Sequence, residues 1–185
     1  MKRQLKVGVI GLGIGEQHII GYNNNPKCKV KTICDFNIEK LKEISEKYPA
    51  CETTLDPNDI LLDKEISVVS IASFDNHHAS QVVKALENKK HVFVEKPLCL
   101  LRSEYSDIEK CLLANEDLYL SSNLILRKTP RFIELKKRID SGQMGIPYLY
   151  EANYDYGRIE KILEINFQGV NVLEDQDLRE GIKVY

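Results

Sequence analysis

The stretch from Leu5 to Tyr22 constrains the fold of this chain more than any other part of the sequence. It opens with closely spaced apolar residues up to Ile10, typical of a short buried strand. Gly11 and Gly13 then turn the chain, and the residues from Glu16 continue with helical spacing. This arrangement can bind a dinucleotide pyrophosphate, because the turn lets backbone approach the phosphates and the helix end presents free N–H groups. Two glycines also occur in turns that only reverse the chain, so both interpretations stay open here.

A second strand is expected over 29–34, where the sequence alternates and then turns apolar. It ends at Asp35, which lies 22 residues beyond Gly13, close to the roughly 20-residue offset of the carboxylate that binds adenosine ribose hydroxyls. The alternative is that Asp35 caps the helix beginning near Asn37. An Asp at this place also repels a 2′-phosphate, which favours NAD over NADP, with Lys40 as the nearest cation.

The chain up to Leu98 continues to alternate between helical and strand patterns. Apolar stripes and buried β-branched runs predict these elements: helices over 38–48, 57–62 and 79–88, and strands over 66–72 and 91–94. A polar loop, 73–78, is expected before the third of these helices. Strand–helix alternation with right-handed crossovers predicts an α/β fold with a doubly wound parallel sheet of the Rossmann type.

Composition argues against several classes of function. The chain has 43% hydrophobic and 29% charged residues and a formal net charge of −2, so no basic excess points to nucleic acid. No apolar run approaches the roughly 18 residues of a membrane span, so no spanning helix is expected. Because the first strand is expected to begin near residue 5, no signal peptide is expected either. The cysteines show no C-x-x-C pairing, which predicts reduced thiols, a cytoplasmic protein and no metal site. They are Cys28, Cys34, Cys51, Cys99 and Cys111.

Polar features follow four of the expected strands, and ligands of doubly wound sheets bind beyond the carboxyl ends of the strands. The four are the glycine turn, Asp35, the loop 73–78 and the step Glu95-Lys96. The last is the most specific, because Pro97 fixes the turn and therefore the direction of the preceding lysine side chain.

Together these stretches resemble the Gfo/Idh/MocA family of NAD(P)-dependent oxidoreductases, which includes sugar and inositol dehydrogenases. The matching stretches are Val7–His18 (VGVIGLGIGEQH), Asp35, Ser73–His78 (SFDNHH), His91–Leu98 (HVFVEKPL) and the glycine pair in Ser141–Gly145. The resemblance covers the chain from about residue 5 to about residue 158. It implies hydride transfer to or from a secondary alcohol on a small sugar- or polyol-like molecule.

The resemblance also implies roles for single residues. Lys96 matches the lysine that faces nicotinamide and substrate and assists proton transfer; the alternative is a solvated lysine paired with Glu95. His78 matches a histidine near the cofactor, or is satisfied by backbone, whereas His77 is expected to point outward. Arg127 fits an arginine shortly after the sixth strand. The expected cofactor-binding residues are Gly11, Leu12, Gly13, Ile14, Gly15, Asp35, Ser73, Phe74, His78, Glu95, Lys96 and Asn123.

Two departures from the family pattern fall in the cofactor site. The third glycine of G-x-G-x-x-G would stand at Glu16, whereas Gly15 comes one place early and is expected to permit close helix packing. Phe74 stands where a proline is common, so the backbone of that loop is not fixed by the resemblance.

Residues 1–122 are expected to form the dinucleotide-binding domain, and residues 123–185 a connecting helix and the truncated start of a second α/β domain. Helical patterns cover 102–114 and 130–141, and alternating tyrosines over 147–157 predict the first strand of another sheet. In the family that domain closes the substrate site and makes the oligomer interface, so a homo-oligomer is one expected state.

The last 28 residues, 158–185, contain the carboxylates Asp175 and Asp177. Neither stands in the sequence context of the carboxylate that acts on the substrate in the family's second domain. The chain is therefore expected to be a truncated form or a fragment of a two-domain dehydrogenase. Two functions stay open: an oxidoreductase, or a non-catalytic dinucleotide-binding module that lacks a complete substrate domain.

Overall fold

The computed structural model describes residues 4–149 and 151. Contacts divide the chain into two compact units, Met1–Ile133 and Glu134–Tyr185, and the first unit holds every strand of the described residues. The domain boundary after residue 122 stays a prediction.

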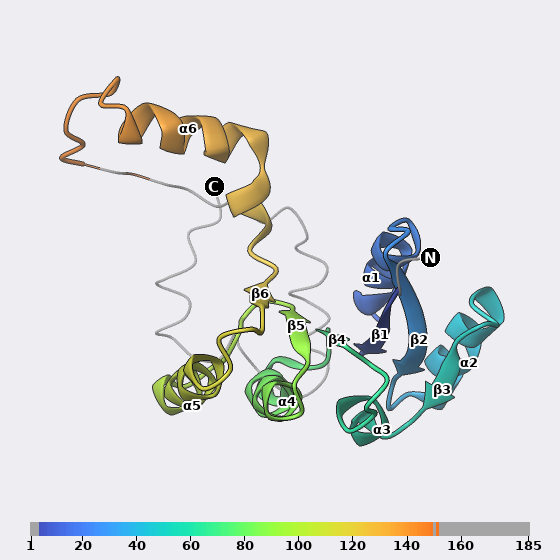
Figure 1. Ribbon diagram of the computed structural model, residues 1–185. Coiled ribbons are helices and arrows are strands. Elements are labelled where there is room, and N and C mark those ends of the chain that lie inside the picture. The colour runs from blue at the N-terminus through green and yellow to red at the C-terminus, as the bar shows by residue number, and fades with distance from the viewer. Residues whose placement is uncertain (1–3, 150, 152–185) are drawn as a thin grey trace, which may run out of the picture. The chain divides into compact units, whose positions relative to one another are not determined.

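Strands and helices alternate along the first unit (Figure 1). The strands are β1 (Leu5–Ile10), β2 (Cys28–Cys34), β3 (Glu52–Thr54), β4 (Val68–Ile71), β5 (His91–Val94) and β6 (Leu120–Ser122). The helices are α1 (Gly15–Asn23), α2 (Ile38–Lys47), α3 (Pro57–Leu61), α4 (Asp75–Glu87) and α5 (Arg102–Leu113), followed by the 3-10 turn η1 (Ile125–Lys128) and by α6 (Pro130–Asp140).

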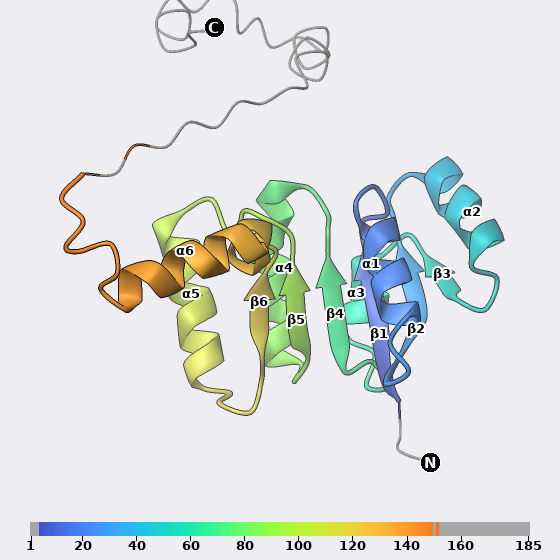
Figure 2. The ribbon, with the colours of Figure 1, turned by 90° about the horizontal axis from the view of Figure 1, so that it is seen from above.

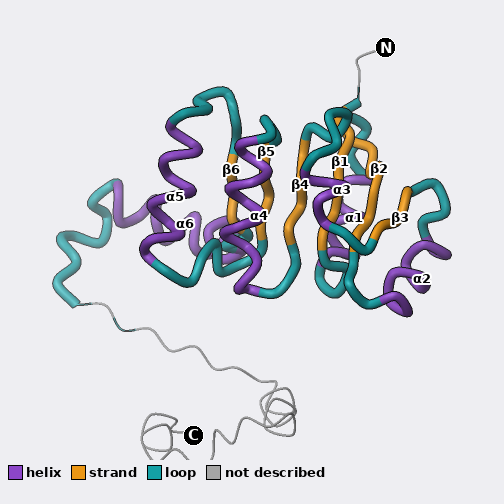
Figure 3. The backbone as a smooth tube through the Cα atoms, turned by 90° about the horizontal axis from the view of Figure 1, so that it is seen from below, coloured by secondary structure: helices purple, strands orange, loops and turns teal. Residues whose placement is uncertain are grey.

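All six strands are parallel and lie in the order β3-β2-β1-β4-β5-β6. Figures 2 and 3 show them as one row, with β3 and β6 at its two edges. The strand order reverses between β1 and β4, which is where doubly wound sheets bind their ligands. The Rossmann-type fold predicted from the sequence is confirmed.

Helices cover both faces of the sheet, with α1 and α2 on one face and α3, α4 and α5 on the other (Figure 1). Each face has its own buried apolar cluster. On the α1 face Val7 and Val9 pack with Ile19 and Ile44, and the opposite cluster joins β4 and β5 to Val82 and other residues of the three remaining helices. Two-sided burial explains why the strands read as continuous apolar runs.

Side chains fix the starts of two helices. The Oδ1 atom of Asn37 accepts the backbone N–H groups of Glu39 and Lys40, each at 3.0 Å, and so caps α2. Asp56 caps α3 in the same way, with Pro57 in the first turn, as the sequence predicts. Because Asn37 provides the cap of α2, the carboxylate of Asp35 is available for other contacts.

The structure corrects two element predictions. Helix α4 begins at Asp75 and not at residue 79, so most of the predicted loop 73–78 is helical. The first turn of α4 is entirely polar, and Phe74 provides no side-chain cap. The apolar pattern that predicts a helix in the sequence therefore begins only at the second turn. Strand β3 was missed because its three residues are polar and lie at the sheet edge.

The prediction of a strand over 147–157 falls mostly outside the described residues. The described residues Pro147–Leu149 and Glu151 are not in a strand. Asp175 and Asp177 also lie outside the described residues.

Candidate functional site

The glycine turn after β1 is shaped by close backbone contacts. Gly11 has a φ of 84°, and a Cβ atom at this place would meet the carbonyl oxygen of Ala72 at 2.3 Å. Its N–H donates to the carbonyl oxygen of Cys34 at 2.8 Å. No atom lies within 4 Å of a Cβ built on Gly13, so the turn is open on that side. At Gly13 the backbone of the turn is therefore not covered by side chains, which is what a pyrophosphate needs in order to approach it closely.

Helix α1 begins directly at Gly15, which packs closely against the sheet. A Cβ on Gly15 would lie 3.1 Å from Cγ1 of Val9 and 3.5 Å from Cβ of Ala72. Gly15 therefore performs the packing task of the third glycine of the fingerprint, one place earlier than usual. Ile14 precedes the helix without a side-chain cap, so the first N–H groups of α1 are left for a ligand.

Glu16 places a negative charge in the first turn of α1, close to the expected phosphate site. Its carboxylate pairs with Lys47 at 3.0 Å and lies 3.9 Å from Nζ of Lys40. Lys40 also bonds to Glu43 at 3.1 Å. The charge of Glu16 is therefore balanced by α2, and Lys40 is already engaged with two carboxylates.

Asp35 joins the glycine turn to the loop after β2. One carboxylate oxygen accepts the N–H of Leu12 at 2.7 Å, and the other accepts the N–H of Asn37 at 2.8 Å. A carboxylate has about four lone-pair sites, so both oxygens keep capacity for the hydroxyl groups of a ribose. Asp35 thus both holds the turn and can bind a ligand beside it.

The ends of β4 and β5 are joined by His78, which is fully buried. Its Nδ1 atom lies 2.6 Å from the carbonyl oxygen of Pro97, and its Nε2 atom lies 3.0 Å from that of Ser73. The Ser73 hydroxyl donates to Gln81 at 2.7 Å. His78 therefore contacts backbone on both sides, as in the alternative interpretation of this residue, and fixes the segment that follows Lys96.

Glu95 is the centre of a buried polar cluster at the carboxyl end of β5. Its carboxylate accepts from Nδ2 of Asn123 at 2.6 Å, from the backbone N–H of Lys96 at 3.2 Å and from Nε2 of His18 at 3.1 Å. Burial by itself would raise the pKa of the Glu95 carboxyl, but these hydrogen bonds outweigh burial and hold that pKa below its usual value. Glu95 is therefore ionised at neutral pH.

The ionised Glu95 also sets the proton position on His18. A carboxylate only accepts hydrogen bonds, so Nε2 of His18 carries the proton. The other ring nitrogen, Nδ1, lies 2.9 Å from the hydroxyl oxygen of Ser70. In this way α1, β4 and the ends of β5 and β6 are tied together.

Lys96 is the second residue after β5 and is exposed. Glu95 binds the backbone N–H of Lys96, and among the described residues no ion pair joins the two side chains. Among the described residues, the Lys96 ammonium is therefore not paired with its neighbouring carboxylate.

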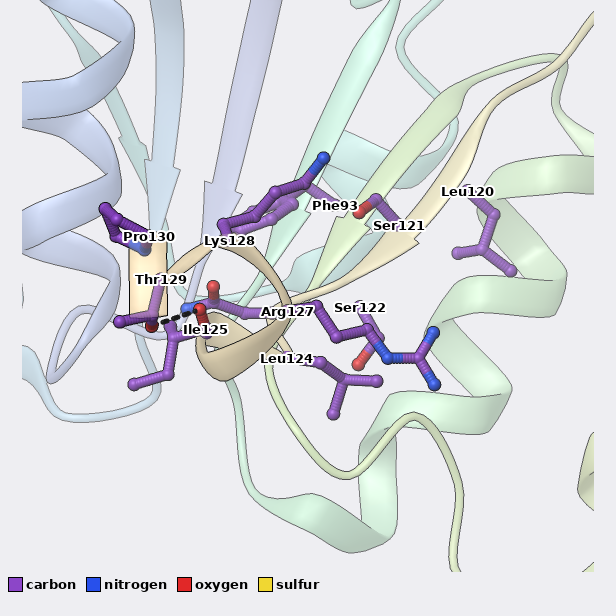
Figure 4. A pocket seen from close by; sticks show the side chains of 11 residues that line it. Phe93, Leu120, Ser121, Ser122, Leu124, Ile125, Arg127, Lys128, Thr129 and Pro130 are labelled. Carbon is purple, nitrogen blue, oxygen red and sulfur yellow. Dashed lines mark hydrogen bonds between the residues drawn. The ribbon is translucent and has the colours of Figure 1, made fainter. Parts of the chain in front are cut away.

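A hollow of about 810 Å³ lies beside Asn123, along the last strands and the turn after them (Figure 4). Its lining comes from β5, β6, η1 and the start of α6, and it includes Asn123, Arg127 and Lys128. The remaining lining residues are Phe93, Leu120, Ser121, Ser122, Leu124, Ile125, Thr129 and Pro130. Among the described residues no group of three His, Cys, Asp or Glu side chains could hold a metal ion, and no helix is long and apolar enough to cross a membrane.

Two residues at this edge were missed by the sequence interpretation. His18 lies 77 residues from its partner Glu95 in the sequence, so no local pattern could indicate their contact. The available signal was that His18 stands three residues after Gly15, at the end of the stretch Val7–His18 that matches the family. Phe36, next to Asp35, is largely exposed and touches Phe74. An aromatic residue directly after Asp35 was the available signal in the sequence.

Comparison with known proteins matches residues 5–120 to the family described as "Oxidoreductase family, NAD-binding Rossmann fold". An uncharacterized oxidoreductase, YrbE of Bacillus subtilis, is 30% identical over 85% of this chain and 49% of its own length. Myo-inositol 2-dehydrogenase of Thermotoga maritima is 29% identical over 78% of this chain and 43% of its own length.

Among solved structures, scyllo-inositol dehydrogenase from Lactobacillus casei with bound NAD(H) and scyllo-inositol matches with a TM-score of 0.71 at 23% identity, over 77% of this chain and 43% of that protein. At this identity the likeness shows the fold. The chain spans less than half the length of these relatives. The family match covers most of the chain, from β1 to the start of β6, and this chain therefore belongs to the oxidoreductase family with an NAD-binding Rossmann fold.

Proposed function

We propose that this chain binds NAD at the carboxyl edge of its sheet and that Lys96 assists hydride transfer between NAD and a secondary alcohol of a sugar-like polyol. The observation that carries the proposal is the convergence of three features on one edge. The glycine turn, Asp35 and Lys96 follow β1, β2 and β5, whose carboxyl ends point the same way. Ligands of doubly wound sheets bind along that edge.

The residues present fit a dinucleotide. The open face of Gly13 and the uncapped start of α1 suit a pyrophosphate, and Asp35 suits the adjacent ribose. Asp35 carries a negative charge where NADP has its 2′-phosphate, and Lys40 is engaged with Glu16 and Glu43. We therefore assign NAD as the preferred cofactor.

NAD, when bound, supplies the nicotinamide that accepts or gives up the hydride. Oxidation of a secondary alcohol also releases its hydroxyl proton to water, and a positioned ammonium group can hold the alcohol oxygen by a hydrogen bond while that proton leaves. We assign this task to Nζ of Lys96, whose backbone is fixed on one side by Glu95 and on the other by the contact of His78 with Pro97. Glu95, His78 and Asn123 are positioning residues in this proposal.

The polyol class is supported by the relatives and by the hollow beside Asn123. Several relatives are named inositol dehydrogenases, and the hollow offers hydroxyl, amide and guanidinium groups to a molecule rich in hydroxyls. These groups include Ser121 and Arg127.

The test is a turnover assay of the full chain with NAD and a panel of inositols and sugars, following NADH formation. Lys96→Ala is expected to abolish turnover and to leave NAD binding, measured by calorimetry, within about threefold of wild type. Lys64→Ala, an exposed lysine distant in sequence from the site, is the matched control and should behave as wild type.

The two halves of the proposal fail separately. NAD binding without any Lys96-dependent turnover would leave a dinucleotide-binding module and remove the enzymatic assignment. Absence of NAD binding would remove both.

A further inference from the structure

Two phenylalanine rings are exposed side by side at the edge of the candidate cofactor site. The side chains of Phe36 and Phe74 are 72% and 63% exposed, although both are large and apolar. Their ring centroids lie 5.6 Å apart, and the ring planes are inclined by 37°. A contiguous aromatic surface that remains open to water is a mark of a binding site.

The backbone places this pair next to the parts of the site that suit the adenosine half of a dinucleotide. Phe36 follows Asp35 at the end of β2, and Phe74 follows Ser73 after β4. β2 and β4 flank β1 in the sheet, so the two rings meet across the glycine turn between them. Asp35 in turn contacts the turn through the N–H of Leu12.

We propose that Phe36 and Phe74 form the platform on which the adenine ring of the cofactor stacks. The inference rests on the proposed binding of NAD and deepens it. With the pyrophosphate at the turn and the ribose on Asp35, the base extends beyond Asp35, which is where Phe36 stands. Phenyl rings bind a purine through its face, and each such stacking contact contributes roughly 1–3 kcal/mol on substitution by alanine.

The platform has a recognisable chemical consequence. A phenyl ring has no hydrogen-bonding group, so its contribution does not depend on the exocyclic amino group of adenine. Removal of either ring should therefore weaken the binding of NAD and the binding of its hypoxanthine analogue by the same factor. Phe74 stands where the family commonly has proline, so this chain has an aromatic contact that a proline would not supply.

The test is an equilibrium titration of the full chain and its variants with NAD, its hypoxanthine analogue and ADP-ribose, measured by calorimetry. Each alanine variant, Phe36→Ala or Phe74→Ala, is expected to bind all three ligands about tenfold more weakly than wild type. A tenfold change in dissociation constant corresponds to about 1.4 kcal/mol per ring. Phe74→Tyr should restore wild-type affinity, because it keeps the aromatic face. Leu113→Ala on α5 is the control, because Leu113 is also 72% exposed and lies outside the site.

Thermal unfolding separates this role from a structural one. Because both rings are exposed, the melting temperature of each variant without ligand should match that of wild type. If both alanine variants bind NAD within twofold of wild type, the platform is wrong and the proposed function stands. If wild type itself binds no NAD, both are wrong.

Discussion

The Nε2 atom of His18 lies 3.1 Å from Oε1 of Glu95, and this contact joins the middle of the first helix to the carboxyl end of β5. Asn123 reaches the same carboxylate oxygen from the end of β6. One buried carboxylate thus ties three elements together at the residue before Lys96. The stability of the site therefore depends on the charge of Glu95.

Glu95→Gln is expected to lower the free energy of unfolding at neutral pH by about 2 kcal/mol, because hydrogen bonds to a charged group become weaker neutral ones. The pKa of Glu95 is lowered in the folded protein from its ordinary value of 4.5. Its contribution is therefore present above that value and is lost as the pH falls through the lower folded pKa.

Urea unfolding across the acidic range measures this effect. The wild type should lose stability more steeply than Glu95→Gln as the pH falls through and below 4.5. Glu46→Gln, which alters an exposed carboxylate of α2, should keep the wild-type profile. Parallel acid profiles for wild type and Glu95→Gln would contradict the central role of this carboxylate.

The two glycines of the turn are expected to respond differently to alanine. Gly11→Ala forces a Cβ against Ala72 at a φ of 84°, and should cost about 3 kcal/mol of folding stability. Gly13→Ala meets no atom within 4 Å, so its stability should stay within about 0.5 kcal/mol of wild type. The methyl group that Gly13→Ala adds instead lies on the uncovered backbone where the pyrophosphate is proposed to bind, so NAD affinity should fall by about tenfold or more. Chemical denaturation and calorimetry measure the two quantities, and a Gly13→Ala variant with full NAD affinity would exclude this stretch of backbone as the pyrophosphate site.

Cofactor choice depends on Asp35 in this proposal. Asp35→Asn keeps the shape and one acceptor oxygen but removes the charge that binds the ribose hydroxyls and repels a 2′-phosphate. NAD affinity is expected to fall by about tenfold, and NADP affinity to fall less or to rise. The measurement is the ratio of the two dissociation constants in paired titrations. An unchanged ratio would show that Asp35 does not select the cofactor.

Most of this fold could be predicted from the sequence, because the patterns that indicate its strands, turns and helices each lie within a short stretch. The buried run of β1, the turn at Gly11 and the place of Asp35 all follow from short stretches, and the structure confirms the parallel sheet that they imply. The start of α4 was missed because its first turn carries no apolar residue. The contact between His18 and Glu95 spans 77 residues and follows only from the packing of α1 on the sheet.

The end of helix α4 shows a residue in an unfavourable backbone conformation. Lys89 has a φ of 59°, in the left-handed region, and it is the only non-glycine residue with a positive φ among the described residues. Its N–H donates to the carbonyl oxygen of Leu86, and the N–H of Lys90 donates to that of Ala85, each at 3.0 Å. This pattern is a Schellman motif, whose left-handed position usually holds glycine.

Replacement of Lys89 by glycine and by alanine isolates the effect of this conformation on stability. Both variants lose the contact of the Lys89 ammonium with Asn115 to the same extent. Only alanine keeps a Cβ in the left-handed region, which costs about 1 kcal/mol. Lys89→Gly should therefore be more stable than Lys89→Ala by about 1 kcal/mol in urea unfolding, the reverse of the order inside a helix. Equal stability of the two, or a more stable alanine variant, would show that the helix ends without a left-handed residue at this place.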